Sequence, residues 1–397
     1  MNKVVILNSP CLPKKSYHCG NAVSQIISEI IFSFFSKFDN TSEFYYVNDS
    51  WNLHGLPFEK MYCDQYGIIG NYKEIKEFAE KHIQYAKEEK RFFSAIKQDS
   101  YAINHSDTDA DFVSYTVELF QYLYKGNYIK KNAEDYFLDL SIVSTNKKIN
   151  NIDNINIFPS HHAKTITNDS SMIHNNYALT KNRVFSPRIK IGNTTCVINP
   201  IFQSFIYPLY ISKKYNIDYP VFAQISSSGH GMLKWHYLRN IISHLLSQNI
   251  PYRNLILHGN ILGNDGKRMS KYSNNIIQPS DLHKILPDKR FIRHVLIKSI
   301  SDNDLPLQTQ VSFSEFNKIK NKLNLLQQTN FSVDNGVILS TFINEIKNSL
   351  KFFKIKKSFD LLYLLIRKVE LRSIHTGMTK NETELKKICE IFYGNKE

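Results

Sequence analysis

Hydrophobic and polar residues follow two different periods over the first fifty positions. Short apolar runs at Val4–Leu7 and Phe44–Val47 are typical of buried parallel strands. Between them, apolar residues recur every three or four positions over 20–35, which predicts a helix. This strand–helix–strand order favours an α/β sheet whose ligand site lies at the carboxyl ends of the strands.

The later pattern separates a variable middle from a second α/β region. Apolar stripes among charges predict helices over 72–129, whereas 146–182 is rich in Asn, Ser, Thr and His and is expected to be an irregular excursion or linker. The α/β pattern then resumes, with a strand, a helix and a strand at 221–225, 232–246 and 255–258. From Asp281 onward the pattern is helical.

Composition narrows the class of protein. The 397 residues are 42% hydrophobic, so a full core can form, and no apolar run is long enough to span a membrane. Five scattered cysteines without a C-x-x-C pair argue against a disulfide framework or a zinc knuckle and fit a reducing, cytoplasmic location. The net charge of +14 suits nucleic acid or nucleotide phosphates, but the lysines are spread along the whole chain.

The loop after the first strand could hold an anion. It runs from Ser9 to Asn21 and contains Pro10, His18 and Gly20. Backbone N–H groups at a helix N-terminus favour negative charge, Gly20 permits close approach, and His18 and Asn21 can donate hydrogen bonds. An ordinary turn with a surface histidine is the alternative.

Two further segments follow strands. Residues 263–275 form a glycine-containing loop with three cations, which could close over a phosphate or could be a solvated basic turn. Residues 51–59 contain His54-Gly55-Leu56-Pro57, a sharp turn at the end of the second strand that could aim a polar group at the sheet edge or could be purely structural.

Taken in their order along the chain, the three segments resemble those of class I aminoacyl-tRNA synthetases of the isoleucine, leucine, valine and methionine group. His18-Cys19-Gly20-Asn21 resembles the HIGH motif, and the Arg-Met-Ser-Lys-Tyr run at 268–272 resembles KMSKS. Residues 51–59 resemble the group's Gly-Trp-Asp-Cys-His-Gly-Leu-Pro-Ile-Glu block. The resemblance covers roughly 1–140 and 196–330.

The resemblance implies a Rossmann-like parallel sheet split by an insertion and followed by a small α-helical C-terminal region. Residues 1–140 are expected to form the first half of the catalytic domain, and 141–195 a reduced insertion or linker. Residues 196–300 are expected to form the second half with the lysine-rich loop, and 301–397 the helical region.

The implied chemistry is ATP-dependent activation of an amino acid, or another carboxylic acid, as an adenylate, followed by transfer to tRNA. Mg²⁺ would accompany the ATP, and no metal site of the protein's own is expected. The residues implied to contact the reacting phosphates are His18, Asn21, Arg268 and Lys271. Those implied to bind ATP are Pro10, Gly20, Gly229, His230, Met269 and Ser270, together with His18, Asn21 and Lys271. Those implied to contact the acid are Trp51, Asn52, His54, Phe202 and His236.

Several positions depart from the family pattern. Asn52 stands where the family has an aspartate for the substrate's α-amino group, and Gly231 stands where an acidic residue contacts the ATP ribose. Ribose binding would then come from His230 or Ser228. The segment from 140 to 196 is too short for the group's editing domain, and the basic tail after 330 is short for its anticodon-binding domain.

Three functions follow from these matches and departures. The first is a compact synthetase-like ligase acting on tRNA. The second is a stand-alone paralogue that passes its adenylate to another acceptor in a specialised pathway. The third is a non-catalytic tRNA- or nucleotide-binding relic. The sequence does not name the acid or indicate an oligomeric state.

Overall fold

The computed structural model describes residues 2–8, 10–13, 17–96, 102–132, 135–139, 155–160, 177–217, 221–226, 229–247, 252–269, 275–307, 313–328, 330–333, 336–374 and 377–394.

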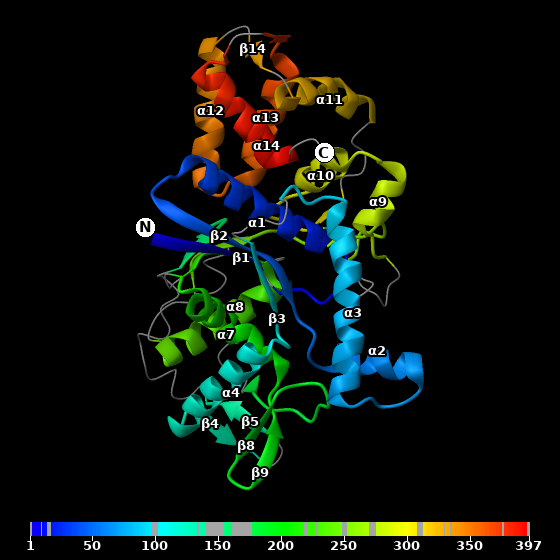
Figure 1. Cartoon of the computed structure of the whole chain (residues 1–397), viewed down its shortest axis with the longest axis vertical. Helices are drawn as coiled ribbons and strands as arrows, with labels where there is room; N and C mark the ends of the chain where they lie inside the picture. The colour runs from blue at the N-terminus through cyan, green and yellow to red at the C-terminus, as the bar shows by residue number, and fades with distance from the viewer. Residues whose placement is uncertain are drawn as a thin grey trace.

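A six-stranded parallel sheet lies at the centre, in the order β3-β2-β1-β10-β11-β6 (Figure 1). Its strands are β1 (Asn2–Asn8), β2 (Ser42–Trp51), β3 (Ala102–Ser106), β6 (Asn156–Phe158), β10 (Val221–Ser226) and β11 (Tyr252–Leu257). The chain runs outward from β1 to β2 and β3, and later returns to β10 on the other side of β1. In doubly wound sheets this reversal of strand order opens a crevice at the carboxyl ends of the two strands.

Helices cover both faces of the sheet because successive strand side chains point to opposite sides. On β1, Ile6 belongs to the hydrophobic cluster that includes α1 (Cys19–Phe38). Its neighbours Val5 and Leu7 belong to a second cluster with α4 (Ala110–Lys125), α7 (Pro200–Tyr215) and α8 (Gly229–Ser247). Figure 1 shows α1 above the sheet and α7 and α8 below it.

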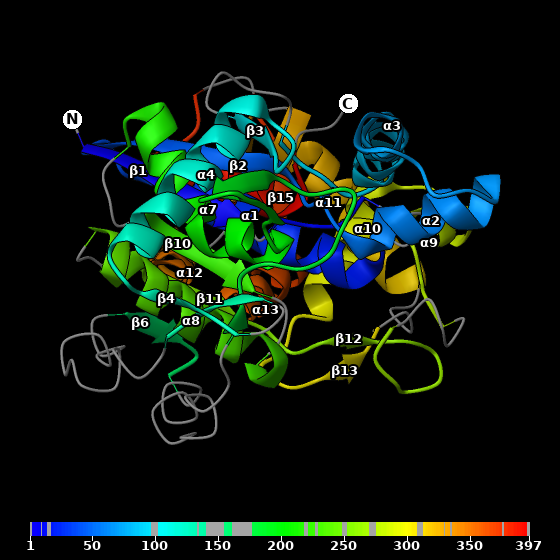
Figure 2. The same cartoon turned by 90° about the horizontal axis from the view of Figure 1, so that it is seen from below.

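Smaller elements surround this core (Figure 2). Two helices follow β2, α2 (Leu56–Tyr66) and α3 (Tyr72–Arg91). Short antiparallel pairs lie near α4, at the end of the molecule opposite the C-terminal helices (Figure 1). They consist of β4 (Ile129–Lys131), β5 (Tyr136–Leu138) and β7 (Tyr177–Ala178), and of β8 (Arg188–Ile191) and β9 (Thr194–Val197).

The C-terminal part is mainly helical and packs on the sheet-free side of α1, which contacts both α10 and α14. The helices are α9 (Pro279–Ile285), α10 (Lys289–Lys298), α11 (Phe313–Gln328), α12 (Gly336–Lys351), α13 (Ile355–Lys368) and α14 (Lys380–Tyr393). Two strand pairs connect them, β12 (Ile261–Leu262) with β13 (Leu305–Pro306), and β14 (Phe331–Val333) with β15 (Leu371–Ser373).

The α/β fold class and the helical C-terminal region are confirmed. The four predicted strands correspond to β1, β2, β10 and β11, although β11 ends at Leu257, one residue before the predicted end at 258. Within 72–129, where helices were predicted, the structure has α3 and α4. The helical prediction was wrong at β3, which lies between them and pairs with β2. The expected irregular excursion at 146–182 also contributes β6, which pairs with β11 at the sheet edge. The expected division into domains stays a prediction.

Candidate functional site

The site begins where β1 and β2 end side by side. Beyond the regular strand, the amide of Cys11 donates to the carbonyl of Ser50 at 2.9 Å, and the amide of Asn52 donates to Cys11 at 2.8 Å. The Asn52 side chain then donates to the carbonyl of Pro10 at 3.3 Å. Pro10 and Asn52, 42 positions apart in the sequence, are thereby held next to each other at the carboxyl edge of the sheet.

The N-terminus of α1 is capped by His18. Its Nδ1 accepts from the amide of Gly20 at 3.1 Å, and Asn21 Oδ1 accepts from the amide of His18 at 3.3 Å, completing a reciprocal capping box. A Cβ on residue 20 would lie 2.9 Å from the imidazole Cε1, so this close packing requires glycine. Because Nδ1 of His18 accepts the hydrogen bond from the Gly20 amide, the imidazole carries its hydrogen on Nε2.

His18 is neutral at physiological pH. Burial, reinforced by the nearby charge of Arg268, lowers its pKa to about 4. The amides of Cys19, Gly20 and Asn21 already have acceptors within the protein. The helix end therefore presents the positive end of its dipole and a neutral imidazole N–H donor, with no negative charge contributed by the first turn. These are the properties that attract a phosphate group to a helix N-terminus.

The lysine-rich loop returns to this helix end. The amide of Cys19 donates to the carbonyl of Ile277 at 2.9 Å, just after the loop. Within the loop, the Asn275 side chain donates to Asp265 Oδ1 at 2.9 Å, and Gly263 lies so close that a Cβ there would be 2.6 Å from the Asn275 oxygen. The two motifs therefore converge on the same end of α1.

The loop's predicted residues differ in their surroundings. Arg268 is exposed and its charge acts on His18, whereas Met269 is buried and packs in the core with α1. Ser270 and Lys271 lie outside the described residues, as do Ser228 and the side chain of His230. Gly229 is the first residue of α8, at the crevice between β1 and β10.

A histidine that the sequence analysis left without a role ties β11 to α1. His258 Nε2 lies 2.8 Å from the Ser24 hydroxyl, its Nδ1 lies 2.7 Å from the Gly259 carbonyl, and burial lowers its pKa to about 4. A Cβ on Gly259 would lie 1.9 Å from the carbonyl oxygen of Asn303.

Beside Pro10 and Asn52 the structure has a pocket of about 200 Å³. It lies between the ends of β1 and β2 and the helices α7 and α8, and its lining consists of Pro10, Asn52, Ile201, Ser204, Phe205, Trp235 and Arg239. This volume is below the ~300–1,000 Å³ of pockets for drug-sized ligands and suits a molecule of amino-acid size.

Arg239 carries the positive charge of the pocket. Its side chain is only 5% exposed, and its Nε and Nη2 donate to the Ser204 carbonyl at 3.0 and 2.8 Å. This fixes α8 against α7 with the guanidinium between them. The same charge, after burial, lowers the pKa of His236.

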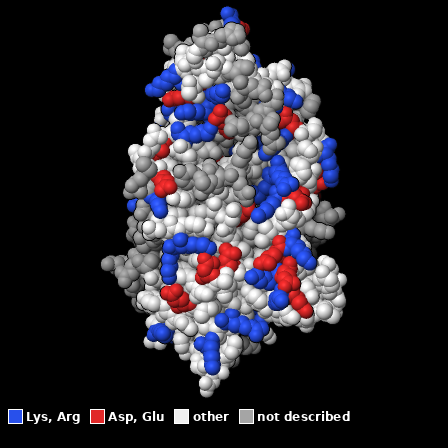
Figure 3. All heavy atoms as spheres, in the orientation of Figure 1, with Lys and Arg blue, Asp and Glu red and all other residues white. Residues whose placement is uncertain are grey.

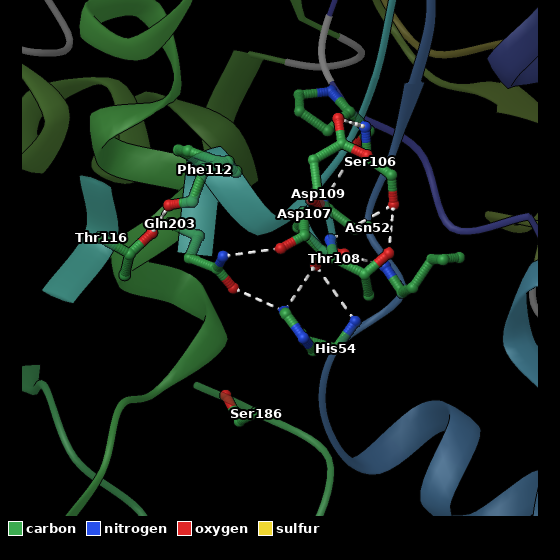
Figure 4. Close-up of polar contacts among 12 residues, drawn as sticks. Asn52, His54, Ser106, Asp107, Thr108, Asp109, Phe112, Thr116, Ser186 and Gln203 are labelled. Atoms are coloured by element: carbon green, nitrogen blue, oxygen red, sulfur yellow. Dashed lines mark hydrogen bonds and ion pairs between the residues drawn. The ribbon is translucent and has the colours of Figure 1, made fainter. Parts of the chain in front are cut away.

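His54 is bonded to α7 through Gln203, the residue next to Ser204 of the pocket lining (Figure 4). Gln203 on α7 donates from Nε2 to the Asp107 carbonyl at 2.9 Å, so its Oε1 is the acceptor for His54 Nδ1 at 2.8 Å. His54 Nε2 then accepts from the Tyr72 hydroxyl at 2.9 Å. Burial lowers the His54 pKa, which favours this neutral tautomer.

Asp107 fixes the backbone of the same turn. Its carboxylate accepts from the amides of Leu53 and His54 at 2.8 and 3.1 Å, and burial raises its pKa. Since Leu53 follows Asn52 directly, this carboxylate sets the orientation of the chain from which Asn52 enters the pocket. Asp107 follows β3, the strand that the sequence analysis did not find.

The other predicted substrate residues lie apart from the pocket lining. Trp51 is buried beneath the Lys90 ammonium, and Phe202 packs edge-on against Phe120 in the core. His236 is buried, with Nδ1 2.5 Å from the Tyr252 hydroxyl. Direct substrate contacts for these residues and for His54 stay a prediction. The lining residues Trp235 and Arg239 were missed, although they lie four positions apart on one predicted helix.

Comparison with known proteins supports the family resemblance. Residues 203–342 match the model for class I tRNA synthetases of the I, L, M and V group. Isoleucine–tRNA ligase of Methanococcus aeolicus is 27% identical over 109 residues, and that of Ureaplasma parvum is 30% identical over 99 residues. These segments cover 28% and 25% of this chain but only 10% of either relative.

Solved structures show the same fold over nearly the whole chain. Mycobacterium tuberculosis methionyl-tRNA synthetase bound by methionyl-adenylate superposes with a TM-score of 0.69 at 11% identity, covering 98% of this chain and 89% of that one. A second structure of that enzyme with methionyl-adenylate gives 0.71 at 13% identity, covering 99% and 89%. The chain therefore has the fold of these methionyl-tRNA synthetase structures, and its residues 203–342 match the family model of class I tRNA synthetases for isoleucine, leucine, methionine and valine.

Proposed function

We propose that this protein uses ATP to activate a carboxylic acid as an acyl-adenylate, with release of pyrophosphate, and transfers the acyl group to tRNA. The observation that carries the proposal is the meeting of two loops at the N-terminus of α1, next to a pocket of amino-acid size. The neighbouring structures with bound methionyl-adenylate support the same type of intermediate.

The helix end supplies the phosphate contacts. In this proposal, the Nε2–H of His18 and the side-chain amide of Asn21 donate to phosphate oxygens, while Arg268 and Lys271 approach from the opposite loop. As the acid's carboxylate attacks the α-phosphorus, pyrophosphate leaves and negative charge builds up on the phosphoryl oxygens. Fixed donors and mobile cations directed at those oxygens stabilise the transition state.

Mg²⁺ would be supplied with ATP. Within the described part of the chain, three or more His, Cys, Asp or Glu side chains nowhere gather into a metal-binding group. Mg²⁺ keeps much of its water shell and commonly binds substrate phosphates, so it can neutralise phosphate charge without a protein cage. Among the described helices, none is long and apolar enough to cross a membrane. A cytoplasmic location is part of this proposal.

The acceptor is proposed from charge and family. The chain has a net charge of +14, and positive and negative side chains are interspersed on the face seen in Figure 3. Such a surface can bind tRNA phosphates through dispersed lysines. A different acceptor in a specialised pathway is the second candidate, and it is favoured by the pocket, which lacks a carboxylate among its lining residues.

ATP–pyrophosphate exchange with pooled carboxylic acids, with and without bulk tRNA, tests the proposal. We expect His18→Ala and Lys271→Ala each to lower exchange by roughly 10²–10³-fold, the usual effect of removing one charge-stabilising donor. Lys190→Ala, an exposed lysine on β8, is the matched control and should retain wild-type exchange. Absence of exchange under every condition, in folded protein, would contradict adenylation and favour a binding relic.

Charging of tRNA separates the two acceptors. Acid-precipitable, alkali-labile label on tRNA after incubation with the labelled acid and ATP supports the first candidate, because an ester to the tRNA 3′ end is stable in acid and hydrolyses in base. Exchange without any labelled tRNA supports the second.

A further inference from the structure

We infer that the acid bound in this pocket carries no α-ammonium group and is a small, mainly apolar carboxylic acid such as a 2-hydroxy acid. The inference rests on the proposed function and specifies its substrate. It follows from the charges and shapes of the residues that line the pocket.

The pocket charge is positive. Among the seven lining residues in the part of the chain that the structure describes, Arg239 is the one charged side chain and none is a carboxylate. Arg239 is 5% exposed, so water screens its charge poorly. An ammonium group brought into this pocket would meet a guanidinium without a lining carboxylate to balance it. An uncharged substituent avoids this repulsion.

Nearby carboxylates have other partners. Asp107 accepts from the Leu53 and His54 amides, and its side chain is not part of the lining. Asp49 accepts from Lys90 at 2.7 Å, with a second lysine, Lys87, at 3.6 Å. Neither carboxylate is placed to compensate an ammonium in the pocket.

The polar lining suits a hydroxyl. With its Nδ2 donating to the Pro10 carbonyl, Asn52 directs Oδ1 away from that bond as a neutral hydrogen-bond acceptor. A hydroxyl can donate to this oxygen without bringing a charge into the pocket. The same lining includes Ile201, Phe205 and Trp235, whose apolar surfaces suit a branched or aromatic side chain.

Matched acid pairs test this inference on the full chain. ATP–pyrophosphate exchange and calorimetric binding in the presence of a non-hydrolysable ATP analogue are measured with isoleucine, methionine and phenylalanine. Each is compared with the 2-hydroxy acid that has the same side chain. We expect the best hydroxy acid to exceed its amino acid at least tenfold in both measurements.

Asn52→Asp adds a carboxylate of nearly the same shape to the pocket. It should shift the preference toward the amino acid at least tenfold, because the ammonium then gains an ionic partner. Asn182→Asp, which changes an exposed asparagine in the same way, is the control and should leave the preference unchanged.

The outcomes separate the two proposals. Preference of the wild type for an amino acid, equal use of both members of every pair, or no binding of any acid would overturn the inference. Preferential binding of a hydroxy acid without exchange would uphold the pocket assignment and contradict adenylation. Preferential exchange supports both.

Discussion

Arg293 and Glu29 form a buried ion pair that joins the C-terminal helices to α1. Their charged atoms lie 2.5 Å apart, and both side chains are at most 1% exposed. Arg293 also donates to the carbonyls of Phe93 and Phe392 at 3.1 and 2.6 Å. Glu29 in turn accepts from the Ala95 amide at 3.1 Å. We predict that Arg293→Met destabilises the protein strongly, since it removes the ionic partner of Glu29 and the donor to three carbonyls, those of Phe93, Ile391 and Phe392.

The magnitude follows from this environment. Removing one partner of a buried pair leaves an uncompensated charge and costs about 3–5 kcal/mol, whereas replacing both partners with apolar groups can be nearly neutral. For 397 residues the entropy of unfolding is about 0.8 kcal/mol per degree, so the single variant should melt about 4–6 °C lower. The double variant Glu29→Met, Arg293→Met should recover at least half of the loss.

Urea unfolding followed by circular dichroism, together with thermal melts, measures these differences. Lys356→Met is the control, because its partner Asp360 is 56% exposed and surface pairs contribute only about 0–1 kcal/mol. A loss below ~1 kcal/mol for Arg293→Met, or a double variant whose loss equals the sum of the two single losses, would refute the reasoning.

Three further predictions concern the residues behind the site. His258 has a pKa lowered from 6.5 to about 4, so the folded protein favours its neutral form. The resulting contribution to the free energy of unfolding, on the order of 3 kcal/mol, is fully present above pH 6.5 and is lost as the pH falls to 4. The unfolding free energy of His258→Gln should therefore fall less steeply over this range in urea titrations. Gly259→Ala should lower the melting temperature by several degrees, because its Cβ would lie 1.9 Å from a backbone oxygen, whereas Gly377→Ala, with nothing within 4 Å, should not. His54→Phe leaves Gln203 Oε1 without its donor, so it should lower the free energy of unfolding in urea by about 2 kcal/mol. It should also raise the KM for the acid in pyrophosphate exchange, and an unchanged KM would contradict the positioning role.

The sheet's central strands could be predicted because their signal is local. Val4–Leu7 is a continuous apolar run, and Val221–Ile225 is interrupted only by Gln224; β1 and β10 pair in parallel around them. Strand β3 could not be recognised in this way. Its sequence, Ala-Ile-Asn-His-Ser, has one large apolar residue, Ile103, and pairing with β2 rather than its own pattern makes it a strand.

The two motif loops were predicted as one site, but the pocket was not. His18 and Arg268 belong to segments that follow one another in a recognisable order, and the structure brings Arg268 close enough for its charge to lower the pKa of His18. The bond from Arg239 to the Ser204 carbonyl joins positions 35 apart on two helices whose apolar patterns carry no sign of it. Contacts of this kind depend on how α7 and α8 cross, which a single sequence does not specify.

The location of the buried ion pair gives the C-terminal helices a role beyond stability. Glu29 lies on α1, the helix whose first turn is capped by His18, and Arg293 fixes that helix to α10 and to the end of α14. Catalysis by fixed donors depends on their positions to within a fraction of an ångström. If α1 is held by this pair, variants that weaken it should lower pyrophosphate exchange even at temperatures where the protein remains folded. Loss of stability without loss of exchange would instead mean that the sheet alone positions the phosphate-binding end of α1.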